Sequence, residues 1–464
     1  MFSKNIYIKR RIELLKNLHS GILLFLGNDE SPMNYADNPY SYRQDSTFLY
    51  YFGISLPGLA ALIDLESGEE VIFGDEMSID DIVWMGRMET LEEKSNKAGV
   101  TRVLPAAKLK DHLQKAQNQK RKIHYLPPYR PENKIRLFHL LGVLPESAKE
   151  GASLDFIKAV ITQRSVKAAE EIEEIEKAVN ITREMHLTAL KTARPGMKES
   201  EVAAAIHAQA LAGGGNISYP IILTVHGEIL HNHYHGNTLL EGHLVLNDSG
   251  AETAMGYAGD LTRTFPAGKK FTEAQKEVYT IVLDALSSAA SQLKPGTRYL
   301  DIHLQACKTL VGGLKDLGLM KGDTEAAVAA GAHAMFFQCG TGHMMGLDVH
   351  DMEDLGEQYV GYTDTLKKNT SQFGLKSLRL GKELQPGFVL TVEPGIYFIP
   401  ELIDLWKSEN RFTEFINYAK LEQYRDFGGI RIEDNYVITE NGAKLLGQPL
   451  VKSIGDIEDI RSAM

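Results

Sequence analysis

The sequence contains little cysteine, no long apolar run and an excess of acidic over basic side chains, and each of these features excludes a class of protein. Only Cys307 and Cys339 occur among 464 residues, which excludes a disulfide framework and favours a reducing compartment. No run of about 18 apolar residues is present, so we expect no membrane-spanning helix. The formal net charge of -11 argues against nucleic acid and anionic membranes as partners.

The N-terminal segment has basic residues followed by the apolar run "GILLFLG", residues 21–27, an order that is also found in signal peptides. The run is short, and a charged amphipathic helix precedes it. We therefore expect a first helix followed by a buried strand. With the low cysteine content, this interpretation favours a cytoplasmic location.

The remaining sequence is typical of a globular α/β protein, with 43% hydrophobic and 24% charged residues. The length favours two to three domains. "GILLFLG", "STFLYYFGI" and "LAALIDLESGEEVIFG" are interpreted as strands, and "KLKDHLQKAQNQKR" as a helix of the same compact unit. A long helical pattern begins at about Ser165. The boundary is expected near 155–165, which divides the chain into domains 1–160 and 161–464.

The second domain contains a weak internal repeat. A long helix, a Pro-Gly turn, a shorter helix and then glycine occur twice, with the turns at Pro195-Gly196 and Pro295-Gly296. The second long helix is expected to begin in "FTEAQKEVY", where Thr272 and Gln275 form a capping-box pattern. Strand-like segments follow each helix pair. The pattern predicts a duplicated α/β unit with any site built from both halves.

A histidine-rich stretch, "EILHNHYHGN" at 228–237, is one candidate metal site. His231, His233 and His235 are two residues apart, a spacing that would line one face of a strand. Imidazole is a common metal ligand, but alternating histidines on a solvated strand edge fit the spacing equally well.

Two aspartates lie in a strand-like, largely apolar stretch, "HLVLNDSGAETAMGYAGDLTRTF". Asp248 and Asp260 would meet across the hairpin that this stretch predicts. They are either turn aspartates bound by backbone N–H groups or members of a cation site. Aspartate is depleted inside strands, so the second interpretation explains why two occur together.

Further candidate ligands follow in three segments of the second half. "CGTGHMMGLDVHD" contains His343 and His350, "PGFVLTVEPGIYF" contains Glu393, and "GGIRIEDNYVIT" contains Glu433 two residues after Arg431. An unpaired carboxylate inside an apolar strand is costly. Four carboxylates and one imidazole would hold two divalent ions, for which manganese, cobalt or zinc is suitable. The residues therefore predict a dinuclear metallohydrolase.

These motifs occur in the order in which the pita-bread metallopeptidases have their metal ligands. "NDSGAE", "GYAGDLTRTF", "GTGHMMGLDVHD", "LTVEPGIYF" and "GIRIEDNYVIT" resemble that family, most closely its aminopeptidase P (Xaa-Pro aminopeptidase) and prolidase members. "YRQDSTFLYYFGISLPGLAALI", residues 42–63, is similar to the N-terminal domain of aminopeptidase P. The resemblance implies a creatinase/prolidase-like N-terminal α/β domain and a C-terminal pita-bread domain with an internal pseudo-two-fold duplication.

The resemblance also implies a role for each matching residue. Asp260 and Glu433 would bridge two metals, Asp248 would complete one shell, and His343 and Glu393 the other. Glu393 would also act as the acid/base, His231 and His350 would face the substrate, and Arg431 would lie beside the last ligand. The implied cofactors are two divalent ions, manganese first, with cobalt or zinc as alternatives.

The implied activity is removal of the first residue from small peptides with proline second, by a homo-oligomer (dimer or tetramer). A prolidase confined to dipeptides is the alternative, followed by a metal-free binding protein on the same fold. Three features depart from the family pattern. Cys339 replaces a family histidine and is expected to be a small buried filler, Asp248 and Asp260 are one residue farther apart than usual, and segments near 355–382 and 399–429 are longer and are expected to form a rim.

Overall fold

The computed structural model describes residues 1–463, which form two compact units. The first contains residues 1–164 and 352–359, and the second contains residues 165–351 and the chain from 360 onward. The sequence-based division into domains 1–160 and 161–464 stays a prediction about independent folding. Within the described residues, no helix is both long and apolar enough to cross a membrane.

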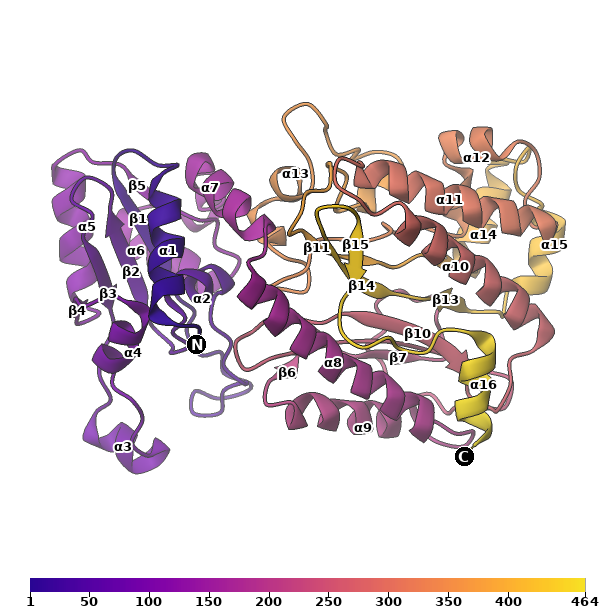
Figure 1. Ribbon diagram of the computed structural model, residues 1–464, viewed down its shortest axis with the longest axis horizontal. Helices are drawn as coiled ribbons and strands as arrows, with labels where there is room; N and C mark the ends of the chain where they lie inside the picture. The colour runs from indigo at the N-terminus through magenta and orange to yellow at the C-terminus, as the bar shows by residue number, and fades with distance from the viewer. Residues whose placement is uncertain (464) are drawn as a thin grey trace. The chain divides into compact units, whose positions relative to one another are not determined.

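The first unit is built on a mixed five-stranded sheet with the order β4-β3-β2-β1-β5. The sheet pairs β1 with β2 and β2 with β3 antiparallel, whereas β1 with β5 and β3 with β4 are parallel. Its strands are β1 (Ile22–Leu26), β2 (Ala60–Asp64), β3 (Glu70–Phe73), β4 (Val103–Leu104) and β5 (Ile123–Tyr125). Its helices are α1 (Lys4–Leu15), α2 (Ser46–Phe52), α3 (Ile79–Met85), α4 (Leu91–Ala98), α5 (Lys108–Asn118), α6 (Pro131–Leu141) and α7 (Leu154–Ser165), as Figure 1 shows.

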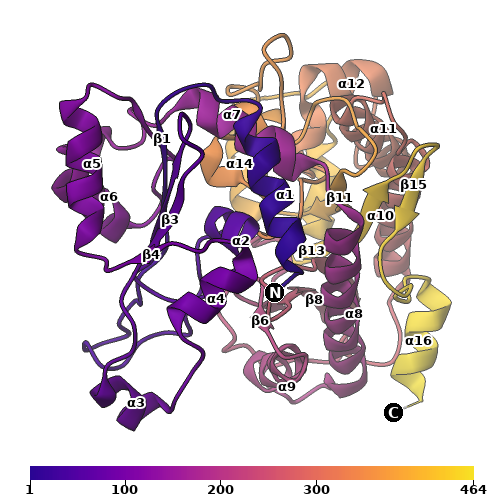
Figure 2. The ribbon, with the colours of Figure 1, turned by 60° about the vertical axis from the view of Figure 1, so that its left-hand side comes forward.

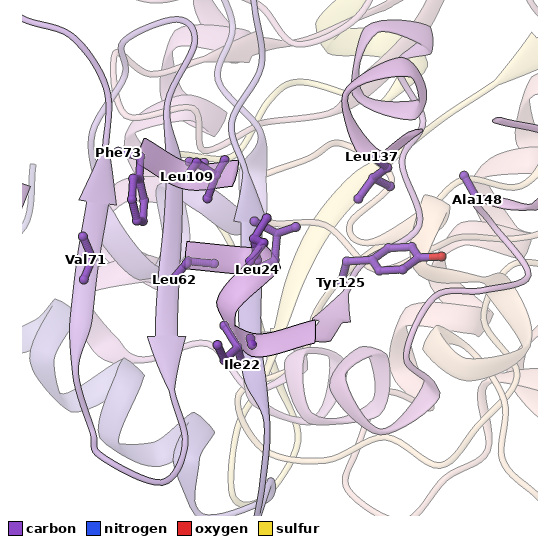
Figure 3. Close-up of a cluster of buried hydrophobic side chains, with 12 residues drawn as sticks. Ile22, Leu24, Leu62, Val71, Phe73, Leu109, Tyr125, Leu137 and Ala148 are labelled. Carbon is purple, nitrogen blue, oxygen red and sulfur yellow. The ribbon is translucent and has the colours of Figure 1, made fainter. Parts of the chain in front are cut away.

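One face of this sheet forms a hydrophobic core with α5 and α6 (Figure 3). Ile22 and Leu24 of β1 lie on that face because alternate strand residues point the same way. They pack in one cluster with Leu109 of α5 and Leu137 of α6. The expected order of a first helix and a buried strand is confirmed by α1 and β1.

The strand expected in "STFLYYFGI" is wrong, because Ser46–Phe52 form the helix α2. Asp45 caps its N-terminus by accepting a hydrogen bond from the Phe48 backbone N–H at 2.9 Å. Gly53 ends the helix with φ +65°, a left-handed conformation that glycine adopts without steric cost. These two caps outweigh the strand preference of the aromatic residues.

The helix α3 lies at the end of an extended loop, away from the sheet of its own unit (Figures 1 and 2). Four of its five apolar side chains are exposed, Trp84 to 84%. They are Ile79, Val83, Trp84 and Met85. The short helix is nevertheless well defined, because Ser78 and Asp81 form a complete capping box.

The second unit confirms the expected repeat of helix pairs. The first pair is α8 (Ala169–Thr192) and α9 (Glu199–Ala212), and the second is α10 (Glu273–Ser291) and α11 (Tyr299–Asp316). The two helices of each pair pack against each other. Gly196 and Gly296 have φ +95° and +82°, so both Pro-Gly turns depend on glycine. Thr272 and Gln275 form the predicted capping box at the start of α10.

Short sheets follow each helix pair and confirm the expected α/β class. β7 (Ile222–Thr224), β8 (Leu244–Ser249) and β10 (Leu261–Pro266) form the sheet of the first half. β11 (Val389–Val392), β14 (Asp434–Ile438) and β15 (Ala443–Leu445) form that of the second. Two-stranded sheets pair β6 (Asn216–Ile217) with β9 (Ala251–Glu252), and β12 (Gly395–Tyr397) with β13 (Gly429–Arg431). A bridge between Thr262 and Glu433 joins the halves.

The remaining helices lie in the longer connections and at the end of the chain. They are α12 (Thr324–Ala330), α13 (Glu357–Val360), α14 (Pro400–Ser408), α15 (Tyr418–Leu421) and α16 (Ile454–Ser462). The two segments that were expected to form a rim therefore contain short helices, with α14 and α15 in the second segment.

Candidate metal centre

Strands of both halves of the second unit position the candidate ligands. Asp248 is in β8 and faces Thr262 of β10, and Asp260 directly precedes β10. Glu393 directly follows β11, and Glu433 lies between β13 and β14. Contacts of β13 with β8 and β10 bring these strand ends together. The predicted meeting of the two aspartates across a hairpin is confirmed.

Tyr219 connects the two aspartates, and the sequence analysis did not identify it. Its hydroxyl oxygen is 2.6 Å from Asp248 Oδ1 and 2.5 Å from Asp260 Oδ1. A phenol has one proton and can donate only one hydrogen bond at a time. The second short contact therefore joins two oxygen acceptors, unless a proton or another cation lies between them.

His343 places a ring nitrogen among carboxylate oxygens. Its Nδ1 is 3.0 Å from the Met344 carbonyl, so that Nδ1–H donates there and the Nε2 lone pair faces the site. Nε2 is 3.3 Å from Asp260 Oδ2 and 3.6 Å from Glu393 Oε1. A lone pair that faces two carboxylates requires a proton or a metal ion between them.

Glu433 provides a buried carboxylate oxygen that is free to bind an ion. Thr262 donates its hydroxyl proton to Glu433 Oε2 at 2.8 Å. Glu433 Oε1 is buried and makes no hydrogen bond to any group of residues 1–463. One ligand atom each from Asp260, His343 and Glu433 lie within 4.8 Å of one another. This grouping, with an orphaned carboxylate oxygen, fits a metal ion.

Burial, together with neighbouring charges, shifts the pKa values of these carboxylates. Burial raises the pKa of Glu393 to about 7, although the His343 and Arg431 charges oppose the shift. Burial and then Asp260 raise the pKa of Glu433 well above its usual range. Burial also raises the pKa of Asp248 despite its ion pair with Arg431. For Asp260 burial acts the same way, but the contributions of His343, Tyr219 and His350 together outweigh it, and the pKa is lowered.

Burial and the neighbouring carboxylates disfavour the ionised forms of Asp248, Glu393 and Glu433, so their negative charge lacks full compensation by positive charge. Divalent cations would supply that charge, and four carboxylates with one imidazole are the oxygen-rich donor set that they prefer. The residues present therefore fit divalent metal ions.

Arg431 is the cation that compensates part of this charge. Its guanidinium donates to Asp248 Oδ2 at 2.5 Å, to the Tyr397 hydroxyl at 2.8 Å and to Thr262 Oγ1 at 3.3 Å. Tyr397, like Tyr219, is a site residue without a recognisable motif. The Arg431 fork fixes the orientation of the Asp248 carboxylate.

Cys339 differs from the expected buried filler, because it is partly exposed and borders the site. Its Sγ lies 3.9 Å from the Tyr397 hydroxyl. Burial raises the pKa of the thiol to about 12, and the Glu393 charge adds to the shift while Arg431 opposes it. Cys339 is therefore a protonated thiol at neutral pH and does not add to the negative charge.

The strand expected for the histidine-rich stretch is wrong, since His231 lies in a turn and 232–237 have no regular structure. Local side-chain bonds produce this conformation: Asn232 donates to Thr224 Oγ1 at 3.0 Å and accepts from the Tyr234 backbone N–H at 3.1 Å. The His235 ring instead contacts the Ile221 carbonyl at 3.1 Å. The three histidines therefore do not line one face.

His231 and His350 lie outside the proposed ligand group but interact with its members. Burial lowers the pKa of His231, the Arg431 charge lowers it further, and Asp248 acts in the opposite direction. Its ring is therefore close enough to sense both charges. The His350 ring lies edge-on to the His343 ring, with centroids 4.3 Å apart.

Comparison with known proteins identifies the same two parts of the chain. Residues 173–440 match the model of metallopeptidase family M24, and residues 7–124 match the aminopeptidase P N-terminal domain. The Escherichia coli Xaa-Pro aminopeptidase is 31% identical over 99% of this chain and 98% of its own length. The human Xaa-Pro dipeptidase is 31% identical over 92% of this chain and 85% of its own length.

A solved structure extends the likeness to the fold. Zinc-substituted E. coli aminopeptidase P in complex with product has a TM-score of 0.80 and 30% identity, covering all of this chain and 99% of that one. The expected recognition and fold class are confirmed. With a family model that matches more than half of its residues and relatives that align along nearly its whole length, the chain belongs to metallopeptidase family M24.

Proposed function

We propose that this chain is an Xaa-Pro aminopeptidase that removes the first residue from peptides with proline second. The observation that carries the proposal is the convergence of three carboxylates, those of Asp260, Glu393 and Glu433, on the His343 ring. It occurs in a chain that aligns with the E. coli Xaa-Pro aminopeptidase over 99% of its length. Peptides are then the substrates, and the metal centre is the catalytic site.

We assign five residues to two divalent ions. Asp260 and Glu433 would bridge the ions, with Asp248 completing one shell and His343 and Glu393 the other. The orphaned Glu433 oxygen and the orientation of His343 Nε2 support this assignment. Manganese is the proposed physiological ion because the donors are mostly oxygen, with cobalt or zinc as substitutes. Bound divalent ions would supply Lewis acidity, which polarises a carbonyl and eases deprotonation of water.

The side chains around the ions would move protons and hold the substrate. Glu393 is the proposed acid/base, because its carboxylate lies among the proposed ligands, 3.6 Å from His343 Nε2, where a proton of the reacting groups can be exchanged. The amide before proline lacks N–H, so its recognition cannot rely on that donor. Like any amide nitrogen, it must gain a proton to leave. We place His231 and His350 on the substrate side. Arg431 would hold Asp248 in position through its 2.5 Å contact.

An Xaa-Pro dipeptidase is the second candidate, because the human enzyme of that name is also 31% identical. The match of residues 7–124 to the aminopeptidase P N-terminal domain favours the aminopeptidase. We propose that the segments 355–382 and 399–429 form a rim that limits substrate length. The Arg379 charge acts on His231, which supports a place for the first segment beside the site. A metal-free binding role does not explain why all five ligand residues are present.

We further propose a cytoplasmic homo-oligomer. Both cysteines are free thiols, which fits a reducing compartment. The exposed apolar side chains of α3 fit a subunit interface, because burying them removes apolar surface from water.

The substrate length preference tests the proposed activity directly. The manganese-loaded protein should release the first residue from Xaa-Pro peptides longer than two residues, and a chelator should abolish this release. The measurement is product formation on an Xaa-Pro dipeptide and on longer peptides in parallel. Cleavage of the dipeptide alone would establish the dipeptidase, and turnover that survives chelation would refute a metal enzyme.

The bridging assignment predicts that Asp260→Ala and Glu433→Ala each lose metal and activity together. Each carboxylate would contact both ions, so either change should reduce bound manganese from two ions towards none. Metal content by mass spectrometry and turnover check this. Asp284→Ala, an exposed carboxylate of α10, is the matched control. Full metal occupancy in both site variants would contradict the assignment.

The raised pKa of Glu393 predicts how metal stabilisation varies with pH. In the metal-free protein this pKa is about 7, above about 4.3 in the unfolded chain. Ionised Glu393 therefore disfavours the folded state, at a cost that grows as pH rises from about 4.3 through 7. Manganese should raise the Tm more at about pH 8 than at about pH 5.5. Glu393→Gln should flatten the pH dependence of the metal-free Tm; an unchanged slope would contradict this.

The substrate-side role of His231 predicts that His231→Ala binds metal normally but turns over about 100-fold more slowly, a typical loss for a proton-transfer group. His233→Ala is the matched control, since His233 is also exposed and lies two residues away. Metal analysis and kcat measure the two effects. Loss of metal in His231→Ala would make this residue a ligand instead.

The oligomer proposal predicts that Trp84→Gln weakens self-association without loss of folding. Trp84 is 84% exposed, so its replacement removes apolar surface that only a partner would cover. Ile12→Gln, an exposed apolar residue of α1, is the control. Sedimentation velocity should show dissociation for Trp84→Gln alone, and an identical oligomer in both variants would exclude α3 as the interface.

A further inference from the structure

A second group of potential metal ligands is buried in the second unit, apart from the carboxylates. His303 and Cys307 lie on α11, and His333 lies in the short 3-10 helix 332–335. Their exposures are 0%, 0% and 1%. One ligand atom from each lies within 4.8 Å of the others. None of the three belongs to the proposed catalytic set.

The two residues of α11 are four positions apart and therefore share one helix face. His303 Nδ1 is 2.8 Å from Thr341 Oγ1, and His303 Nε2 is 3.5 Å from Cys307 Sγ. With Nδ1–H donated to the threonine hydroxyl, the Nε2 lone pair points to the sulfur. An S–H···N hydrogen bond would explain this pair alone, but not the third member.

The burial of His333 is not explained by hydrogen bonding of the kind found in an ordinary polar core. Neither of its ring nitrogens has a hydrogen-bond partner in the described chain, 1–463. A buried imidazole without partners is costly, and native structures contain few such groups. Its proximity to a thiol and a second imidazole provides the partner that it lacks, if an ion binds between them.

We propose that His303, Cys307 and His333 bind one zinc ion, or a similarly thiophilic divalent ion, at a site distinct from the catalytic metals. Zinc–nitrogen and zinc–sulfur bonds of about 2.0 and 2.3 Å in a tetrahedral site separate the two ligand atoms by about 3.5 Å. The His303 Nε2 to Cys307 Sγ distance is 3.5 Å. Thiolate and imidazole together select zinc over the harder ions that carboxylates prefer.

The protonation states agree with this geometry. Burial lowers the pKa of His303 to about 3 and that of His333 to about 4, with the nearby Val328 carbonyl partly offsetting the latter shift. Both rings are therefore neutral and can bind a metal at neutral pH. Burial raises the pKa of Cys307, so zinc binding breaks its S–H bond, forms a zinc–sulfur bond and releases one proton to solvent.

The position of this site gives the ion a structural role. The Thr341 hydroxyl is bonded to His303, and the Thr341 carbonyl accepts the Glu393 backbone N–H at 2.7 Å and the Tyr299 hydroxyl at 3.1 Å. Zinc would fix the His303 ring and, through Thr341, the segment that precedes His343. The ion would thereby stabilise the position of the segment that leads to His343, as outer partners of metal ligands do.

Cobalt substitution tests the proposal without an activity assay. The full-length protein, reduced and freed of metal, is titrated with Co²⁺ while the near-ultraviolet thiolate-to-cobalt charge-transfer band is followed. The band should saturate within three equivalents, because the two proposed catalytic ions also take up cobalt, and Zn²⁺ should displace it. The band should persist in Asp260→Ala, because the catalytic ligands contribute no sulfur, so its result is independent of the proposed function.

Substitutions test which cysteine provides the sulfur ligand and whether His333 is the third ligand. Cys307→Ser should abolish the band, whereas Cys339→Ser should retain it. His333→Gln should require at least about 10-fold more Co²⁺, the size of effect seen for lost metal-site partners, while His207→Gln, a histidine of α9, should not. Absence of the band in the wild-type protein overturns the proposal even if a variant fails to fold. A band that survives Cys307→Ser or disappears in Cys339→Ser also overturns it.

Discussion

The second unit depends on one constraint, the accumulation of carboxylates in a buried site whose own cations are too few. Arg431 pairs with Asp248, but Glu393 and Glu433 have raised pKa values and one Glu433 oxygen lacks a partner among residues 1–463. Buried like charges within a few ångströms of one another are unfavourable unless a counter-charge is shared. Divalent ions supply that charge, so folding, metal binding and chemistry are coupled in this part of the chain.

The duplicated architecture explains how a chain can place these acids together. Each half contributes a helix pair and a small sheet, and the acids lie in or directly beside strands. The bridge between Thr262 and Glu433 joins the two halves at the site itself. Thr262 also donates to Glu433 Oε2 and accepts from Arg431 Nε. A single threonine therefore orients a ligand and the arginine that neutralises another.

Much of the site could be predicted from sequence, because carboxylates are rarely placed in apolar strands without a reason. Asp248, Asp260, Glu393 and Glu433 stand out on that ground alone, and the structure brings them together. Tyr219 could not be found in this way, since a tyrosine near a strand is ordinary and its role depends on two aspartates that are 29 and 41 residues away. The role of Tyr219 depends on its position in the folded chain and not on a sequence pattern.

The errors also have identifiable physical causes. The aromatic stretch 46–52 became α2 because caps at Asp45 and Gly53 outweigh strand preference. The histidine-rich stretch does not form a strand because Asn232 bonds the Thr224 hydroxyl and the Tyr234 backbone N–H. His303 and Cys307 are visible as an i, i+4 pair, but His333 joins them only through tertiary packing. Hydrophobic periodicity in the sequence reports neither short-range side-chain bonds nor long-range packing.

Anomalous diffraction from crystals of the manganese-loaded protein tests the central claim most directly. The account predicts two manganese peaks roughly 3.5–4 Å apart, both contacted by the carboxylates of Asp260 and Glu433. Crystals grown with excess manganese that show no anomalous peak among the four carboxylates, or show peaks that contact neither Asp260 nor Glu433, would contradict it.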